Sequence, residues 1–247
     1  MRKEILLHAK DNLRMTCLDG CYPEQRAIVL CLHGLAGDKN SSVIDRLSQV
    51  MKDENIGTFT FDWPAHGNSP EPERYFTTAY CQEYIRAAVS FLKDRYGSLP
   101  LYCFATSFGG YMAMLYHLNH PDTFDRIFLR SPALNIADTL TGFMNEDQMT
   151  DFMNGKELDF GFDRPLLLGK AHYDDIRAHD IYSSAPLYPE KIFIIHGELD
   201  DVVPVRDSQL YAERNGIKLY VLAGADHRYK NSGDVETVME KAKRWFL

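Results

Sequence analysis

The stretch LYCFATSFGGYMAML, Leu101–Leu115, changes its hydrophobic pattern halfway along. Its first six residues form an apolar run that is typical of a buried strand, whereas its last residues are typical of a helix. Ser107 lies at the junction, and the residues two positions before and after it, Ala105 and Gly109, are small. Small residues are needed at a tight strand-to-helix turn, because the strand and the helix pass close to each other. The pattern predicts a sharp turn that exposes the serine hydroxyl; an ordinary strand–helix turn is the alternative.

Similar apolar runs recur along the whole chain. They are RAIVLCLHG at 26–34, TFTFDW at 58–63, RIFLRS at 126–131, KIFIIHG at 191–197 and KLYVLAG at 218–224. Between them, apolar residues repeat at helical spacing, for example over 43–51, 84–92 and 235–245. Continuous apolar strands that alternate with amphipathic helices predict an α/β fold with a mostly parallel central sheet and helices on both faces. The segments 4–9 and 14–19 are expected to form an opening antiparallel hairpin.

One long region interrupts this alternation. From Ala133 to Pro186 the sequence has no strand signal but contains many aromatic and methionine side chains. They include Phe143, Met144, Met149, Phe152, Met153, Phe160, Phe162 and Tyr173. Segments of this kind inside a compact domain are typically lids or binding loops. We therefore expect an inserted cap at 133–186 and a core at 1–132 and 187–247; an extra pair of core helices is the alternative.

Composition limits the class of partner. The chain of 247 residues has 27 basic and 35 acidic residues, a formal net charge of −8, and no basic run. This acidic balance argues against nucleic acid or a membrane surface as the partner. The odd set of five cysteines and the lack of a leader-like segment predict a cytoplasmic protein with reduced thiols. The sequence leaves open whether the protein is a homodimer.

Two amide groups are candidates for binding an oxyanion. The amide of Phe108, directly after the serine, would lie at the start of the helix and face a charge that develops on a substrate carbonyl. His33-Gly34 follows another strand and precedes a flexible loop. That loop can direct a second amide, that of Leu35, toward the same position. We interpret His33 itself as a structural loop residue.

A base and an acid for the serine follow later strands. Asp200 lies in HGELDDVVP at 196–204, and His227 lies in GADHRY at 224–229. Asp201 is the rival carboxylate, but Asp200 fits the spacing His-Gly-x-x-Asp-x-x-Val-Pro better. A serine, an aspartate and a histidine that each follow the carboxyl end of a parallel strand would meet at one edge of the sheet. There the histidine can take the serine proton while the aspartate orients the imidazole.

With these residues in place, the sequence resembles the α/β-hydrolase superfamily from the first hairpin to the last helix. The segment DWPAHGNS at 62–69 is similar to the family's Asp-x-x-Gly-x-Gly-x-Ser loop, with Ala65 where glycine is common. Within the superfamily, the segments at 166–186, 196–204 and 224–229 most resemble small bacterial cinnamoyl/feruloyl esterases and serine aminopeptidase-like hydrolases. The serine turn departs from their pattern, because Ala105 replaces the usual glycine.

The resemblance implies a carboxylesterase that cleaves small acyl or aromatic esters through an acyl-enzyme intermediate. The catalytic residues would be Ser107, Asp200 and His227, and the substrate would be a small-molecule ester; the reaction needs no metal or other cofactor. By the same resemblance, Asp138 and Tyr173 in the cap would contact polar substituents on the substrate's ring; surface residues without such a role are the alternative. An acyltransferase, thioesterase or peptidase with the same three residues is an alternative. So is a non-catalytic small-molecule binder on this fold.

Overall fold

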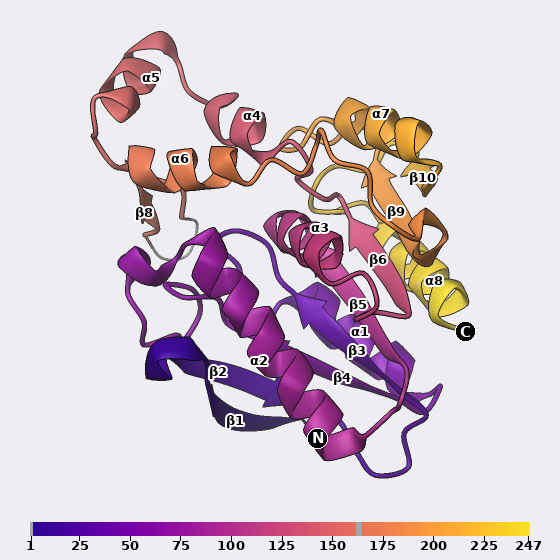
Figure 1. Ribbon diagram of the computed structural model, residues 1–247. Coiled ribbons are helices and arrows are strands. Elements are labelled where there is room, and N and C mark those ends of the chain that lie inside the picture. The colour runs from indigo at the N-terminus through magenta and orange to yellow at the C-terminus, as the bar shows by residue number, and fades with distance from the viewer. Residues whose placement is uncertain (1, 162–164) are drawn as a thin grey trace.

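The computed structural model describes residues 2–161 and 165–247, so Phe162 of the expected cap lies outside the described residues. In these parts of the chain, eight strands form one sheet in the order β1-β2-β4-β3-β5-β6-β9-β10 (Figure 1). The strands are β1 (Lys3–His8), β2 (Arg14–Asp19), β3 (Ala27–Leu32), β4 (Ile56–Phe61), β5 (Leu101–Thr106), β6 (Arg126–Arg130), β9 (Ile192–Gly197) and β10 (Lys218–Leu222).

The strand directions confirm the predicted fold class. β1 and β2 form an antiparallel hairpin, and β2 pairs antiparallel with β4. From β4 onward across the sheet, every pair of neighbouring strands is parallel. The carboxyl ends of β3, β5, β6, β9 and β10 therefore meet at one edge of the sheet, where a site built from strand-end loops can form.

Helices cover the sheet on both sides, which explains why β3, β4 and β9 are buried along their whole length. Alternate residues of β5 point to opposite faces, as the two-residue period of a strand requires: Cys103 and Ala105 join one core cluster and Phe104 joins the other. The first cluster contains residues of α2 (Thr78–Tyr96), α3 (Phe108–Asn119) and α7 (Val205–Asn215), and the second contains residues of α1 (Ser42–Lys52) and α8 (Asp234–Phe246).

The region between β6 and β9 forms small elements outside the main sheet (Figure 1). They are α4 (Ile136–Thr141), α5 (Glu146–Met153), β7 (Leu158–Asp159), β8 (Leu167–Leu168) and α6 (Lys170–Ala178). The expectation of no strand here was wrong, because β7 and β8 pair as a short antiparallel ladder. Two-residue strands are too short to give a periodic signal in the sequence.

Two hydrogen bonds join α6 to the start of α2. Asp175 accepts hydrogen bonds from the backbone N–H of Thr78, at 2.7 Å, and from its hydroxyl, at 2.9 Å. Thr78 is the first residue of α2. The carboxylate therefore occupies the positive end of that helix, where a negative charge is stabilised.

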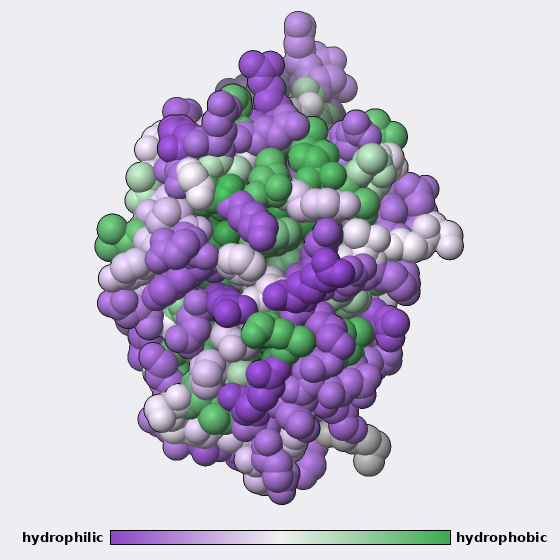
Figure 2. All heavy atoms as spheres, turned by 90° about the vertical axis from the view of Figure 1, so that its right-hand side faces the viewer, coloured by the Kyte–Doolittle hydropathy of each residue, from purple (hydrophilic) through white to green (hydrophobic). Residues whose placement is uncertain are grey.

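The face of the molecule shown in Figure 2 is hydrophilic over most of its area, and most of its hydrophobic atoms lie in its upper half. None of the helices in the described ranges has both the length and the apolarity to cross a bilayer. The five cysteines are free, and four of them, Cys17, Cys31, Cys81 and Cys103, are buried.

Candidate active site

Ser107 lies at a strained turn between β5 and α3. Its backbone has φ 51° and ψ −115°, a conformation that residues other than glycine rarely adopt. Surrounding groups hold the turn in place: its N–H donates to Arg130 O at 3.1 Å, and its carbonyl accepts from Gly110, Tyr111 and Ala133 at 2.9, 3.2 and 3.1 Å. Strain of this kind persists only where neighbours fix it, and it is concentrated at functional sites.

Gly109 allows the helix to approach the neighbouring strand. A methyl group at this position would lie 2.5 Å from Leu32 O and 2.6 Å from His33 O, closer than carbon and oxygen can pack. Ala105, the departure from the family pattern, is fully buried between its partners Leu32 and Leu129 in the sheet. The extra methyl at Ala105 therefore fits, whereas one at Gly109 would not.

Asp200 and His227 lie in contact. Nδ1 of His227 is 2.7 Å from Oδ2 of Asp200, and Oδ1 of Asp200 accepts from the backbone N–H groups of Val202 at 3.0 Å and Val203 at 2.8 Å. The Asp200 side chain is fully buried, and that of His227 is 13% exposed. Asp201, the rival carboxylate, is exposed.

The hydrogen bonds decide the charge of Asp200. Burial alone would raise the pKa of this carboxyl, but hydrogen bonds from His196 and His227 outweigh it and hold the pKa well below its usual range. Asp200 is therefore a carboxylate at neutral pH. A carboxylate on Nδ1 keeps the proton of a neutral imidazole on that nitrogen and leaves Nε2 free to accept one.

Arg130 connects the serine turn with the histidine loop. Its carbonyl accepts from Ser107 N, and its guanidinium Nη2 donates to the carbonyl of His227 at 3.3 Å. The guanidinium also lies 4.2 Å from the centre of the Tyr229 ring, and the Tyr229 hydroxyl is 3.2 Å from Ser131 Oγ. Residues at the end of β6 therefore contact both of the segments that carry Ser107 and His227.

The two predicted oxyanion amides belong to segments that lie close to Ser107. Phe108 begins α3, so its N–H has no partner within the helix. The other loop is also close, because a methyl group on Gly34 would lie 3.3 Å from Cβ and 3.9 Å from Oγ of Ser107. Leu35 follows Gly34. In the described chain, neither the Leu35 nor the Phe108 amide donates to another protein group.

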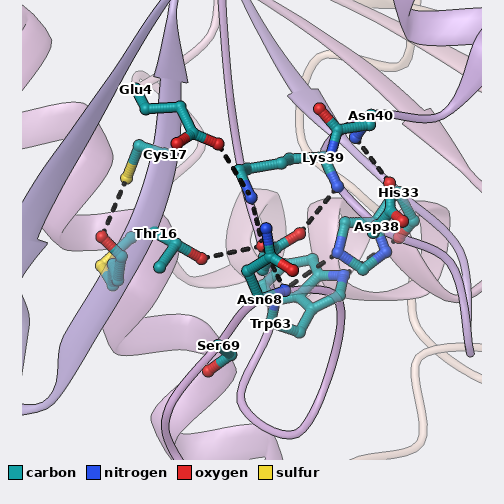
Figure 3. Close-up of polar contacts among 12 residues, drawn as sticks. Glu4, Thr16, Cys17, His33, Asp38, Lys39, Asn40, Trp63, Asn68 and Ser69 are labelled. Carbon is teal, nitrogen blue, oxygen red and sulfur yellow. Dashed lines mark hydrogen bonds and ion pairs between the residues drawn. The ribbon is translucent and has the colours of Figure 1, made fainter. Parts of the chain in front are cut away.

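A buried ion pair holds the loop that carries Leu35. Nζ of Lys39 lies 2.8 Å from Oδ2 of Asp62, and the two side chains are 1% and 0% exposed. Oδ1 of Asp62 accepts from the backbone N–H of Lys39 at 2.8 Å, and Oδ2 accepts from Thr16 Oγ1 at 2.8 Å and Asn68 N at 3.0 Å. Thr16, Lys39 and Asn68 lie close together in Figure 3, where dashed lines mark polar contacts.

His33 belongs to the same framework. Its Nε2 accepts from the backbone N–H of Trp63 at 3.3 Å, and its carbonyl accepts from the Trp63 indole at 3.0 Å. Burial lowers the pKa of His33, which keeps the ring neutral. These hydrogen bonds hold His33 and its loop in place against Trp63. The DWPAHGNS motif indicated that 62–69 was important, but nothing in the sequence showed that Asp62 would pair with Lys39.

The predicted substrate residues lie in two different surroundings. Asp138, in α4, helps to line a cavity of about 410 Å³ together with Tyr111 of α3 and Ile176 of α6. Its Oδ2 accepts from the Asn135 side chain at 2.9 Å. Tyr173 is buried with its ring centre 6.0 Å from that of Phe152, and within the described ranges it is not part of the cavity wall.

Over residues 2–161 and 165–247, no group of three or more His, Cys, Asp and Glu side chains is arranged to hold a metal ion.

The parallel sheet, the strained serine turn after β5 and the Asp200–His227 contact after β9 and β10 together define an α/β-hydrolase. The model of the family described as serine aminopeptidase, S33, matches residues 23–155, which is more than half of the chain. The chain therefore belongs to this hydrolase family. No curated protein matches its sequence.

Solved structures support the same fold at low sequence identity. A hydrolase from Agrobacterium vitis S4 has a TM-score of 0.85 and 17% identity, with 100% of both chains covered. Est1E from Butyrivibrio proteoclasticus, solved with ferulic acid bound, has a TM-score of 0.78 and 21% identity, covering 98% of this chain and 97% of that one. The Pyrococcus furiosus esterase Pf2001 has a TM-score of 0.69 and 20% identity, covering 99% and 93%.

Proposed function

We propose that this hydrolase is a serine carboxylesterase that cleaves small acyl or aromatic esters through an acyl-enzyme intermediate. The observation that carries the proposal is the contact between His227 Nδ1 and Asp200 Oδ2 at 2.7 Å, together with a serine held at φ 51° at the end of β5. Arg130 hydrogen-bonds to both the Ser107 and the His227 backbone, which supports their action as one unit.

In the proposed reaction, Ser107 Oγ attacks the ester carbonyl while Nε2 of His227 takes its proton. Asp200 stabilises the imidazolium that results, and the amides of Leu35 and Phe108 bind the oxyanion. His227 then delivers the proton to the leaving alcohol, and water releases the acyl group by the same steps in reverse order. Loss of one oxyanion donor would lower kcat by roughly 10²–10³-fold.

We also propose that residues 133–186 act as a cap that selects the substrate. The 410 Å³ cavity between α3, α4 and α6 has the size of pockets that hold small organic ligands. Its described wall does not include Ser107, Phe108 or His227, so a substrate held there would have to extend beyond the cavity to reach the serine. The ferulic acid bound to Est1E supports an aromatic acyl group as a candidate. Asp138 on the cavity wall is the proposed contact for a polar ring substituent. A role for Tyr173 stays a prediction from the resemblance.

The test is the Ser107→Ala variant assayed with p-nitrophenyl acetate and butyrate. We expect kcat to fall by roughly 10⁶-fold, since loss of the nucleophile removes the whole mechanism. A fluorophosphonate probe should label the wild-type protein at Ser107 and leave the variant unlabelled. Ser48→Ala is the matched control, because Ser48 Oγ, on α1, bonds to Ile44 O and Thr58 Oγ1, neither of which belongs to the proposed site. Full activity in folded Ser107→Ala would contradict the proposal, and an unlabelled wild type would favour the non-catalytic binder.

Cleavage of aminoacyl amides by the same residues is the second candidate. The match to the serine aminopeptidase family over residues 23–155 favours it. Ester and amide substrates with the same acyl group would separate the two, because the triad chemistry is shared and only the fit of the substrate differs. A higher kcat/KM for the amides than for the matched esters would replace the esterase assignment with a peptidase.

A further inference from the structure

His196 has contacts that the proposed mechanism does not use. It is the residue before Gly197 at the end of β9, and it precedes Asp200 by four positions. Its side chain is completely buried, which is uncommon for a polar ring unless each nitrogen has a partner. Both ring nitrogens do have partners here, and one of them is Asp200.

The contacts fix which nitrogen carries the proton. Nε2 lies 3.0 Å from Val203 O and 3.1 Å from Asp200 Oδ2, and both of these atoms are acceptors. The ring hydrogen must therefore be on Nε2, shared between the two. Nδ1 then accepts a hydrogen bond from Ser208 Oγ, 2.8 Å away on α7. Ser208 is also fully buried, so water does not compete for this hydrogen bond.

The result is a carboxylate with donors on both oxygens. Oδ1 of Asp200 accepts from the amides of Val202 and Val203, while Oδ2 faces the imidazoles of His196 and His227. This arrangement leaves the carboxylate little freedom to rotate. Oδ2 also accepts hydrogen bonds from two ring N–H groups instead of one, so each ring interacts with a charge that is already partly compensated by the other.

We propose that His196, with its tautomer set by Ser208, is a positioning residue that fixes the orientation of Asp200 and limits the charge it presents to His227. This inference rests on the proposed function, in which Asp200 orients the base. Loss of the His196 N–H would leave Asp200 free to turn. It would also concentrate its charge on His227, which stabilises the imidazolium and makes His227 harder to deprotonate.

Other charged groups surround this network and stay in place in the test. Arg130 of β6 faces Asp200 and Asp226, and Asp207 of α7 interacts with His196. The variants below leave all of these side chains unchanged. Ser208→Ala keeps every ionisable group, including His196, so a shift of the pH profile in that variant is assigned to the altered hydrogen bonds of His196 and Asp200.

The experiment compares His196→Ala, His196→Gln and Ser208→Ala by the pH dependence of ester hydrolysis, per active site titrated with fluorophosphonate. We expect His196→Ala to lower kcat by about tenfold, because the variant loses one hydrogen bond to a charged group. KM should change little. The acidic limb of the kcat/KM profile should move to higher pH. His196→Gln retains an N–H near the position of Nε2, and it should restore most of the rate. Ser208→Ala should give a smaller change in the same direction.

His117→Ala is the matched control. This buried histidine of α3 also donates from Nε2 to a backbone carbonyl, that of Leu187 at 2.7 Å. It should lower stability as His196→Ala does, while kcat and the acidic limb stay at wild-type values. The proposal is overturned if His196→Ala and Ser208→Ala keep the wild-type kcat and limb. If His196→Ala does not fold, the kcat and the acidic limb of His196→Gln and Ser208→Ala test the proposal instead.

A readout that does not need turnover separates this inference from the proposed function. In ¹⁵N imidazole NMR spectra of the wild-type protein, His196 should be protonated on Nε2 and unprotonated on Nδ1. The Nδ1–H resonance of His227 should shift in Ser208→Ala and His196→Gln. A His196 protonated on Nδ1 overturns the assignment even in an active esterase. If no ester is hydrolysed, the proposed function fails, and the NMR result still tests the contacts of His196.

Discussion

The guanidinium of Arg130 donates a hydrogen bond to the carbonyl oxygen of His227 across 3.3 Å, from the end of β6 to the loop after β10. The carbonyl of the same residue accepts from Ser107 N at 3.1 Å. A single buried residue therefore holds the backbone of both the proposed nucleophile and the proposed base. The relative position of these two groups depends on a side chain that would not itself touch the substrate.

Replacement of Arg130 by Met should therefore impair catalysis more than folding. We expect Arg130→Met to lower kcat by roughly 10–100-fold, because small displacements of reacting groups carry large rate penalties. Steady-state kinetics per titrated active site and the thermal midpoint would measure the two effects. Arg126→Met is the control: Arg126 lies on the same strand, donates to the Trp245 carbonyl and contacts the Trp245 ring. Equal kcat losses in both variants would contradict this role of Arg130.

The buried pair of Lys39 and Asp62 gives a prediction about stability. Lys39→Met would leave the Asp62 carboxylate buried without its cation, which should cost roughly 3–5 kcal/mol in the free energy of unfolding. Urea unfolding monitored by circular dichroism would measure it. Lys156→Met removes a lysine from the exposed pair with Asp151 and should cost less than about 1 kcal/mol. A Lys39→Met loss as small as that of Lys156→Met would show that the buried pair is not stabilised by its charges.

The close approach at Gly109 predicts a steric effect at the serine turn. A methyl 2.5 Å from Leu32 O forces α3 away from β3, so Gly109→Ala should cost about 1–3 kcal/mol and displace Ser107. Unfolding measurements and fluorophosphonate labelling rates would show both effects. Gly169→Ala is the control, since its methyl would meet only the flexible side chain of Glu157 at 3.2 Å. A Gly109→Ala variant with wild-type stability and labelling would rule out the tight packing described here.

The lowered pKa of Asp200 predicts how its contribution depends on pH. The pKa is depressed in the folded state, so the stability from Asp200 is fully present above its unfolded pKa of about 3.9 and is lost as pH falls toward the folded value. Asp200→Asn should therefore be less stable than the wild type at pH 7, by roughly 1–3 kcal/mol. The difference should shrink as pH falls below about 4.

The exposed neighbour provides the control for this series. Asp201→Asn should unfold like the wild type at every pH, since Asp201 is exposed. Guanidinium unfolding of the three proteins from pH 7 down to acid would give the comparison. A stability difference for Asp200→Asn that grows as the pH falls would reverse the predicted sign and exclude a stabilising carboxylate.

The sequence by itself determined the fold class and the strands of the main sheet. The apolar runs at 26–34, 101–106 and 191–197 predicted β3, β5 and β9, because strand burial is a local pattern of side chains. The small residues around Ser107 predicted the turn, because the strand and the helix pass close to each other there. The order Ser107, Asp200, His227 could also be read along the chain. The cytoplasmic location stays a prediction, and whether the protein is a homodimer stays open.

Only the tertiary structure decided which distant side chains meet. The Lys39–Asp62 pair, the Arg130 link to His227 and the contact of His196 with Ser208 join residues from different strands, helices and loops. A lone buried histidine or lysine in a sequence has no periodic signal. Its partner is set by the strand order and by the exclusion of water, which force each buried charge or ring nitrogen to find a partner in space.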